Sequence, residues 1–278
     1  CRSHGQAYSI VVIIYIINRY PFPGALQAKP KSKGASVTPM QRLEGLMRKA
    51  IQDYEMIAPG DKICVGVSGG KDSVALTIGL AHLRRYLGIS FEVYAVTLDP
   101  QFGGEPVDYS PLEELFRQHE VPYHVHRTDI GRIVFDLRKE PRPCSLCAKL
   151  RRGMLHSAAL ELGCNKVALG HHLDDAIETF YMNLWQEGRI GWFSPGTTLS
   201  RRELTLIRPM LLATENDVVH AVRNAGLPIV KSRCPADGAT LRQSTKDFVH
   251  TMMHKDPAFR QKMLGAMQDS GIDGWAPL

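Results

Sequence analysis

Apolar and polar residues follow a repeating order along the chain, in which short apolar runs alternate with segments of helical spacing. The runs predict buried strands at residues 63–67, 91–98, 123–126 and 166–169. Apolar residues at helical spacing predict helices at residues 39–54, 74–86, 111–119, 144–162 and 174–185. This alternation predicts an α/β fold: a Rossmann-like parallel sheet with helices on both faces.

The C-terminal third has a less regular pattern. Residues 191–209 predict a polar loop or hairpin with a turn at Pro195 and Gly196. A helix at 215–224 and a short strand at 228–230 are expected to follow, and then C-terminal helices. We therefore expect one domain at residues 40–255, with residues 256–278 as a C-terminal helix and tail.

The first 39 residues differ from the rest. An apolar run at 8–17 has half of the roughly 20 residues that a membrane-spanning helix needs. Residues 21–39 are rich in Pro, Lys, Gly and Ser, which is typical of a linker. We interpret residues 1–39 as a disordered or non-native tail, with Met40 as a candidate start, and we expect no membrane partner.

Composition indicates an ordinary globular protein, with 44% hydrophobic and 22% charged residues among 278. The net charge of +6 is concentrated in residues 1–39, which hold five basic and no acidic residues. Global charge is therefore no evidence for a nucleic-acid partner, and only local clusters count. The candidate basic residues are Lys149, Arg151, Arg152, Arg201, Arg202, Arg233, Arg242 and Lys246.

The most specific motif is SGGKDS at residues 68–73, between the first predicted strand and its helix. Glycines at a helix N-terminus let successive backbone N–H groups converge on a phosphate. The spacing excludes a Walker loop, and the hexapeptide matches the pyrophosphate-binding loop (PP-loop) of enzymes that cleave ATP between its α- and β-phosphates. The nucleotide-binding candidates in the loop are Ser68, Gly69, Gly70, Lys71, Asp72 and Ser73.

A second motif, GHHLDD at residues 170–175, follows the strand predicted at 166–169. The carboxyl ends of parallel strands share one edge of a sheet, so this motif and the PP-loop are expected to meet in one crevice. Asp174 and Asp175 either hold Mg²⁺ against ATP phosphates or cap the following helix. Of His171 and His172, one is expected to contact nucleotide and the other to pack.

Three of the six cysteines form the other chemical signal. Cys144 and Cys147 are three positions apart at a predicted helix start, which places both sulfurs on one face. Cys234 follows much later. Three thiolates suit a [4Fe–4S] cluster with one open iron, while zinc bound by three Cys and one His, or a thioredoxin-like pair, are alternatives that stay open.

These motifs together resemble the tRNA 2-thiocytidine synthase family of PP-loop ATPases. The resemblance covers about residues 40–255 and includes CAKLRRG at 147–153, IRP at 207–209 and LRQ at 241–243. It implies the adenine nucleotide α-hydrolase fold with a small C-terminal helical extension. It also implies an ATP-dependent sulfurtransferase that adenylates a cytidine of the tRNA anticodon loop, with a [4Fe–4S] cluster on Cys144, Cys147 and Cys234.

The resemblance also sets expectations for the site and its partners. Lys71, Asp72 and Asp175 are the catalytic candidates, and Gly170, His171 and Asp174 join the PP-loop residues in binding ATP and Mg²⁺. The expected partners are tRNA and a sulfur donor, either a cysteine desulfurase or free sulfide, in the cytoplasm, and a homodimer stays open. The alternatives are a PP-loop enzyme of the 2-thiouridine or lysidine type and an ATP-binding metal sensor without turnover.

Overall fold

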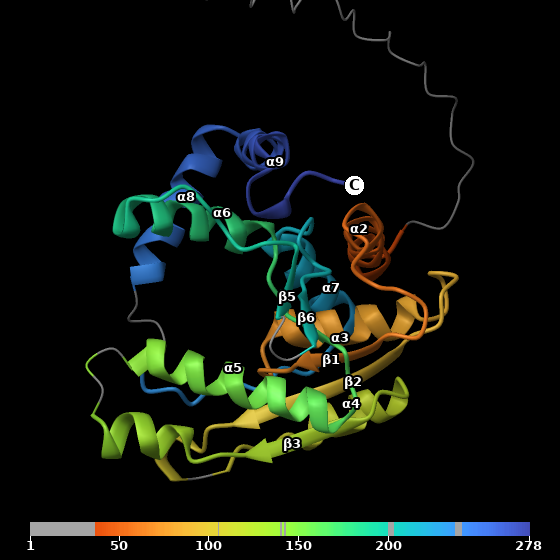
Figure 1. Cartoon of the computed structure of the whole chain (residues 1–278), viewed down its shortest axis with the longest axis vertical. Coiled ribbons are helices and arrows are strands. Elements are labelled where there is room, and N and C mark those ends of the chain that lie inside the picture. Colours follow the sequence, from red (N-terminus) through yellow and green to blue (C-terminus); the bar gives the residue numbers. More distant parts are fainter. Residues whose placement is uncertain (1–36, 105, 140, 142, 200–202, 237–240) are drawn as a thin grey trace, which may run out of the picture. The chain divides into compact units, whose positions relative to one another are not determined.

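The computed structural model describes residues 37–278 except 105, 140, 142, 200–202 and 237–240, so most of the predicted tail lies outside it. Six strands form one sheet in the order β3-β2-β1-β4-β6-β5 (Figure 1). All neighbouring pairs are parallel except β5 with β6. The strands are β1 (Lys62–Gly66), β2 (Glu92–Asp99), β3 (Tyr123–Arg127), β4 (Lys166–Ala168), β5 (Gly196–Leu199) and β6 (Leu204–Ile207).

Helices cover both faces of the sheet, as the sequence predicted (Figure 1). Ile63 and Val65 of β1 pack in the larger core with α2, α3, α4 and α7, while Cys64 between them faces Leu155 of α5. The helices are α2 (Pro39–Asp53), α3 (Lys71–Leu83), α4 (Ser110–Gln118), α5 (Pro143–Glu161), α6 (Leu173–Met182), α7 (Glu215–Ala225), α8 (Leu241–Lys255) and α9 (Phe259–Ser270).

Shorter helical turns complete these elements, at Phe102–Gly104, Arg132–Leu137, Asn183–Glu187 and Ile272–Gly274. The helix predicted to continue to residue 185 ends at Met182, and a π-helical turn carries the chain onward. In the described part of the chain, no helix combines the length and the apolar character that crossing a membrane requires.

Two local predictions in the C-terminal third were wrong. The hairpin of β5 and β6 exists, but Gly196 begins β5 instead of turning, because residues 196–199 pair with β6 along their length. Residues 228–230 form no strand. The N–H of Val230 donates instead to the carbonyl of Gly69 at 3.0 Å, which fixes this segment against the PP-loop.

Residues 256–278, which the sequence predicted to be a C-terminal helix and tail, belong to the same compact unit as the rest of residues 37–278. Trp275 is fully buried in the larger core. Its indole N–H donates to the carbonyl of Phe193 at 2.9 Å, and its own carbonyl accepts from the Tyr54 hydroxyl at 3.0 Å. Trp275 therefore joins α2, the segment before β5 and the C-terminal end of the chain.

Replacing Trp275 with Ala should lower the free energy of unfolding by about 3–5 kcal/mol, because it opens a large cavity and leaves the Phe193 carbonyl without its donor. Chemical denaturation measures this loss. Trp185→Ala is the matched control, because the side chain of Trp185 is 51% exposed and its loss should cost much less. Equal losses in the two variants would contradict the anchoring role of Trp275.

Candidate active site

The PP-loop joins the carboxyl end of β1 to the first residue of α3. Gly69 has a φ of +85°, which favours glycine, and Gly70 caps α3 without any side-chain hydrogen bond. The Ser73 hydroxyl donates to the Gly70 carbonyl at 3.0 Å and accepts from the Ser68 N–H at 3.1 Å. The serines thus brace the loop, while the first turn of α3 directs its N–H groups and positive potential at the crevice.

The end of β4 lies directly against this loop. A Cβ on Gly170 would lie 3.1 Å from the carbonyl carbon of Asp72 and 3.3 Å from the N of Ser73. Glycine at position 170 therefore permits a backbone-to-backbone contact between the two motifs that the sequence placed in one crevice. The structure brings them together as predicted.

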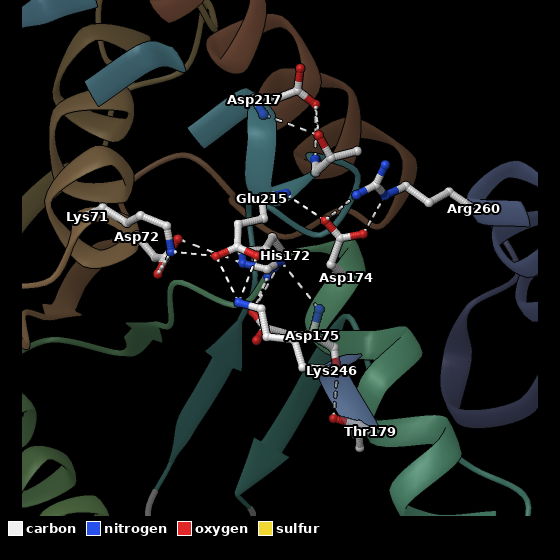
Figure 2. Close-up of polar contacts among 11 residues, drawn as sticks. Lys71, Asp72, His172, Asp174, Asp175, Thr179, Glu215, Asp217, Lys246 and Arg260 are labelled. Carbon is white, nitrogen blue, oxygen red and sulfur yellow. Dashed lines mark hydrogen bonds and ion pairs between the residues drawn. The ribbon is translucent and has the colours of Figure 1, made fainter. Parts of the chain in front are cut away.

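Lys71 belongs to an ion-pair network that joins three helices. Its ammonium lies 3.0 Å from Asp72 and 3.2 Å from Glu215 at the start of α7. Lys246 of α8 approaches the same Glu215 carboxylate at 2.9 Å. Figure 2 shows Lys71 and Lys246 converging on Glu215. The sequence indicated Lys71 but gave no role to Glu215, and it counted Lys246 only among the basic residues.

The ion pairs shift the pKa values of Glu215 and Lys71 so that both stay charged at neutral pH. Burial works to raise the pKa of Glu215, but Lys246 and Lys71 outweigh it and lower that pKa to about 2. Burial works to lower the pKa of Lys71, and the carboxylates of Asp72 and Glu215 outweigh it and raise that pKa. Lys71 is therefore a full cation beside the loop before any ligand binds.

Asp175 and His172 cap α6 reciprocally. The His172 N–H donates to the Asp175 carboxylate at 2.9 Å, and the Asp175 N–H donates to Nδ1 of His172 at 3.3 Å. Nε2 of His172 then lies 3.8 Å from Oδ1 of Asp72. This Asp72 oxygen is buried without a hydrogen-bond partner among the described residues, so Asp72 is the carboxylate best placed to receive a cation.

Asp174 points to the C-terminal helices (Figure 2). Its buried carboxylate accepts from Arg260 of α9 at 2.6 Å and from the N–H of Glu215 at 2.8 Å. Those donors occupy both carboxylate oxygens. In this structure Asp174 therefore joins α6 to α7 and α9. Its predicted contact with nucleotide stays a prediction, as does that of Gly170. Arg260 carried no signal in the sequence.

His171 lies beside the PP-loop, in the lining of a cavity. Its ring packs at 4.9 Å from the ring of Phe193. It lines a cavity of about 600 Å³ together with Ser68 of the loop. Of the two histidines, His171 is thus exposed to a ligand beside the PP-loop, while His172 caps α6.

The three candidate cysteines lie in segments that meet near the PP-loop. Cys144 and Cys147 begin α5, and Cys234 follows Val230 by four residues. Burial raises the pKa of the Cys147 thiol, Arg151 opposes that rise, and the charges of Cys234 and Cys144 add to it. The thiols are therefore electrostatic neighbours, although no three His, Cys, Asp or Glu side chains among the described residues already stand in metal-binding geometry.

Several basic candidates accompany the cysteines. Arg151 and Arg152 line the 600 Å³ cavity, and Arg151 and Arg233 line a second cavity with Ser68 and Gly70. Arg201 and Arg202 lie outside the described residues, as does the side chain of Arg242. Arg151, Arg152 and Arg233 thus lie near the PP-loop, while Lys149 is exposed and lines a different cavity.

The fold and the loop together define a PP-loop nucleotide-dependent protein, and the PP-loop domain family matches residues 40–248. The chain is 39% identical to the tRNA-cytidine(32) 2-sulfurtransferase of Syntrophotalea carbinolica and 36% identical to that of Pelobacter propionicus. Each match covers 82% of this chain, with 88% and 86% of the relatives. The chain belongs to the tRNA-cytidine(32) 2-sulfurtransferase family of PP-loop proteins, which confirms the resemblance found in the sequence.

Solved structures confirm the fold. The U34-tRNA thiolase of Methanococcus maripaludis, solved with its [4Fe-4S] cluster, superposes with a TM-score of 0.66 at 20% identity. The match covers 80% of this chain and 76% of the thiolase. The predicted Rossmann-like parallel sheet is therefore correct.

Replacing Gly170 with Ala should weaken ATP binding by about tenfold or more, because its Cβ forces the backbone at Asp72 and Ser73 to move. Equilibrium dialysis of the purified protein measures the affinity. Gly45→Ala is the control, because a Cβ at that exposed helical position meets nothing within 4 Å. An unchanged affinity in Gly170→Ala would show that the loop tolerates the displacement.

Proposed function

We propose that this protein thiolates a cytidine of the tRNA anticodon loop at C2, using ATP to activate the base. One observation carries the proposal: the backbone bond from Val230 to Gly69 brings the segment that leads to Cys234 against the PP-loop. A phosphate-binding loop and a set of thiols thus lie in one region. Activation and sulfur delivery can then take place on the same bound nucleotide.

The PP-loop residues perform the activation. The cytidine O2 attacks the α-phosphate of ATP, a new O–P bond forms, and the bond to the β-phosphate breaks to release pyrophosphate. Lys71 and the first N–H groups of α3 neutralise the charge that develops on the phosphates. Because Asp72 and Glu215 already hold the Lys71 ammonium in place, little reorganisation accompanies ATP binding.

Asp72 is our candidate ligand for Mg²⁺ beside the phosphates. Its Oδ1 atom is buried without a hydrogen-bond partner among the described residues, and Mg²⁺ prefers one or two carboxylates plus phosphate oxygens. Asp175 acts as a positioning residue in this scheme. It fixes His172, whose ring stands between Asp175 and Asp72.

Cys144, Cys147 and Cys234 would hold a [4Fe–4S] cluster. All three are free thiols, and Cys144 and Cys234 lie near enough to Cys147 to raise its pKa, which a cationic group would offset. When bound, such a cluster supplies an iron site that can carry sulfide. A sulfur nucleophile then attacks C2 of the adenylated base, a C–S bond forms, and AMP leaves with the former carbonyl oxygen. Arg151, next to these thiols, supports the anionic sulfur.

The remaining partners follow from this chemistry. The sulfur is expected from a cysteine desulfurase or from free sulfide, and the tRNA is expected to approach over the arginines beside the PP-loop. We expect the reaction to take place in the cytoplasm, because its substrates are tRNA and ATP. A homodimer is compatible with the scheme, which uses residues of one chain.

Lys71→Met should reduce tRNA-dependent pyrophosphate release by about 100-fold or more, because a preorganised cation no longer stabilises the transferred phosphate. Pyrophosphate is measured with ATP and unmodified tRNA. Lys49→Met is the control, because Lys49 pairs with Asp53 on the exposed face of α2. Wild-type pyrophosphate release by Lys71→Met would remove the PP-loop lysine from the reaction.

Ser in place of Cys144, Cys147 or Cys234 should abolish bound iron and 2-thiocytidine formation while ATP binding remains. The measurements are iron and sulfide content after anaerobic purification, and nucleoside analysis of the tRNA product. Cys164→Ser is the control, because Cys164 is buried in the core between the sheet and α5. Full thiolation by a Cys144→Ser, Cys147→Ser double variant would exclude a role for these cysteines.

A further inference from the structure

The cavity beside the PP-loop has an unusual charge distribution. It measures about 600 Å³ and lies between α5 and the carboxyl ends of the strands. Arg151 and Arg152 of α5 line it, and Arg208, directly after β6, lines it as well. Among the described residues around the cavity there is no Asp or Glu. The remaining lining is largely apolar, from residues such as Val96, Leu98 and Leu155.

Arg208 is a buried cation without a counter-ion among the described residues. It is only 7% exposed. One Nη donates to the carbonyl of Ser194, and the guanidinium lies over the Phe193 ring at 4.9 Å. Its Nε is buried and has no hydrogen-bond partner among the residues that the structure describes. The Nε–H of Arg208 is therefore available to donate to a ligand in the cavity.

Electrostatics make this arrangement costly in the protein alone. Burial, and then the like charge of Arg152, lower the pKa of Arg208 to about 10. The side chain is still protonated at neutral pH, and an unpaired buried charge is destabilising. Neither Ser194 nor Phe193 supplies a negative charge, so no described residue neutralises Arg208, and an anionic ligand in the cavity would do so.

We propose that Arg208, with Arg152 and Arg151, forms a second phosphate-binding subsite, distinct from the backbone cradle of the PP-loop. A guanidinium is planar and matches two phosphate oxygens at once, and the apolar wall next to it suits a nucleoside. The ligand is a nucleotide phosphate, either from ATP or from the nucleotide of the RNA that is modified. The RNA source rests on the function proposed above.

His171 connects this subsite to the PP-loop. Its ring contacts Phe193, and the Arg208 guanidinium lies over the same Phe193 ring. Both His171 and Ser68 line the cavity. A nucleotide phosphate bound at Arg208 is thereby presented to the region where the PP-loop holds ATP. The subsite would position one reactant against the other.

The test compares Arg208→Gln with wild type in two binding assays at fixed ionic strength. One measures ATP affinity by equilibrium dialysis, and the other measures affinity for unmodified tRNA by filter binding. A loss of about tenfold or more is expected in one assay, and the assay that changes identifies the source of the phosphate. Arg117→Gln is the control, since Arg117 pairs with Glu114 on the exposed face of α4. Both affinities within twofold of wild type would overturn the subsite.

Two further variants separate binding from folding. Arg208→Met should keep or raise the melting temperature, because it removes an unpaired buried charge. A large drop in melting temperature with both affinities intact would show a purely structural arginine and overturn the subsite. If Arg208→Gln does not fold, Arg152→Gln at an exposed position of the lining repeats the binding test with the same criteria. Thiolation of tRNA by the wild type is scored separately, so a failure of the subsite is distinguishable from a failure of the proposed function.

Discussion

The site depends on close approach between backbone segments at the PP-loop. A Cβ on Gly69 would lie 2.9 Å from the carbonyl oxygen of Val230, and one on Gly170 would reach the carbonyl of Asp72. Two segments far apart in the sequence therefore contact the loop through main-chain atoms. The contact at Gly69 leaves no room for a Cβ, and the contact at Gly170 would be unusually tight with one. These two contacts fix the PP-loop relative to the residues after β4 and relative to the segment before Cys234.

Around this backbone core, charge holds the helices in place. Asp174 of α6 binds Arg260 of α9 and the N–H of Glu215, and the carboxylate of Glu215 binds Lys71 and Lys246. This chain of contacts links α3, α6, α7, α8 and α9. Asp72 also pairs with Lys71, so three acidic and three basic side chains balance there, whereas the cavity that Ser68 and His171 line holds arginines without acids among its described residues. That contrast gives the crevice a neutral side and a cationic side.

Much of the fold could be predicted from the sequence because strands and helices leave local patterns. The strand–SGGKDS–helix order and the position of Gly170 after β4 could be predicted because both motifs follow a strand directly and require glycine there. Glu215 and Arg260 were missed because each is a single charged residue outside the motifs that signal a site, with partners distant in the sequence. Arg208 belongs to the IRP motif, but that motif gave it no role. The segment at Val230 has the composition of a strand, but its N–H donates to Gly69 instead of joining the sheet. Only tertiary structure decides such choices.

The shared carboxylate of Glu215 has a consequence for how related chains can diverge. Two ammonium groups, from Lys71 and Lys246, rest on one acidic side chain. Loss of that acid alone would leave two neighbouring cations in mutual repulsion beside the phosphate cradle. Natural variation at these three positions should therefore be correlated: a chain that has dropped the acid should also have exchanged the second lysine for a neutral residue.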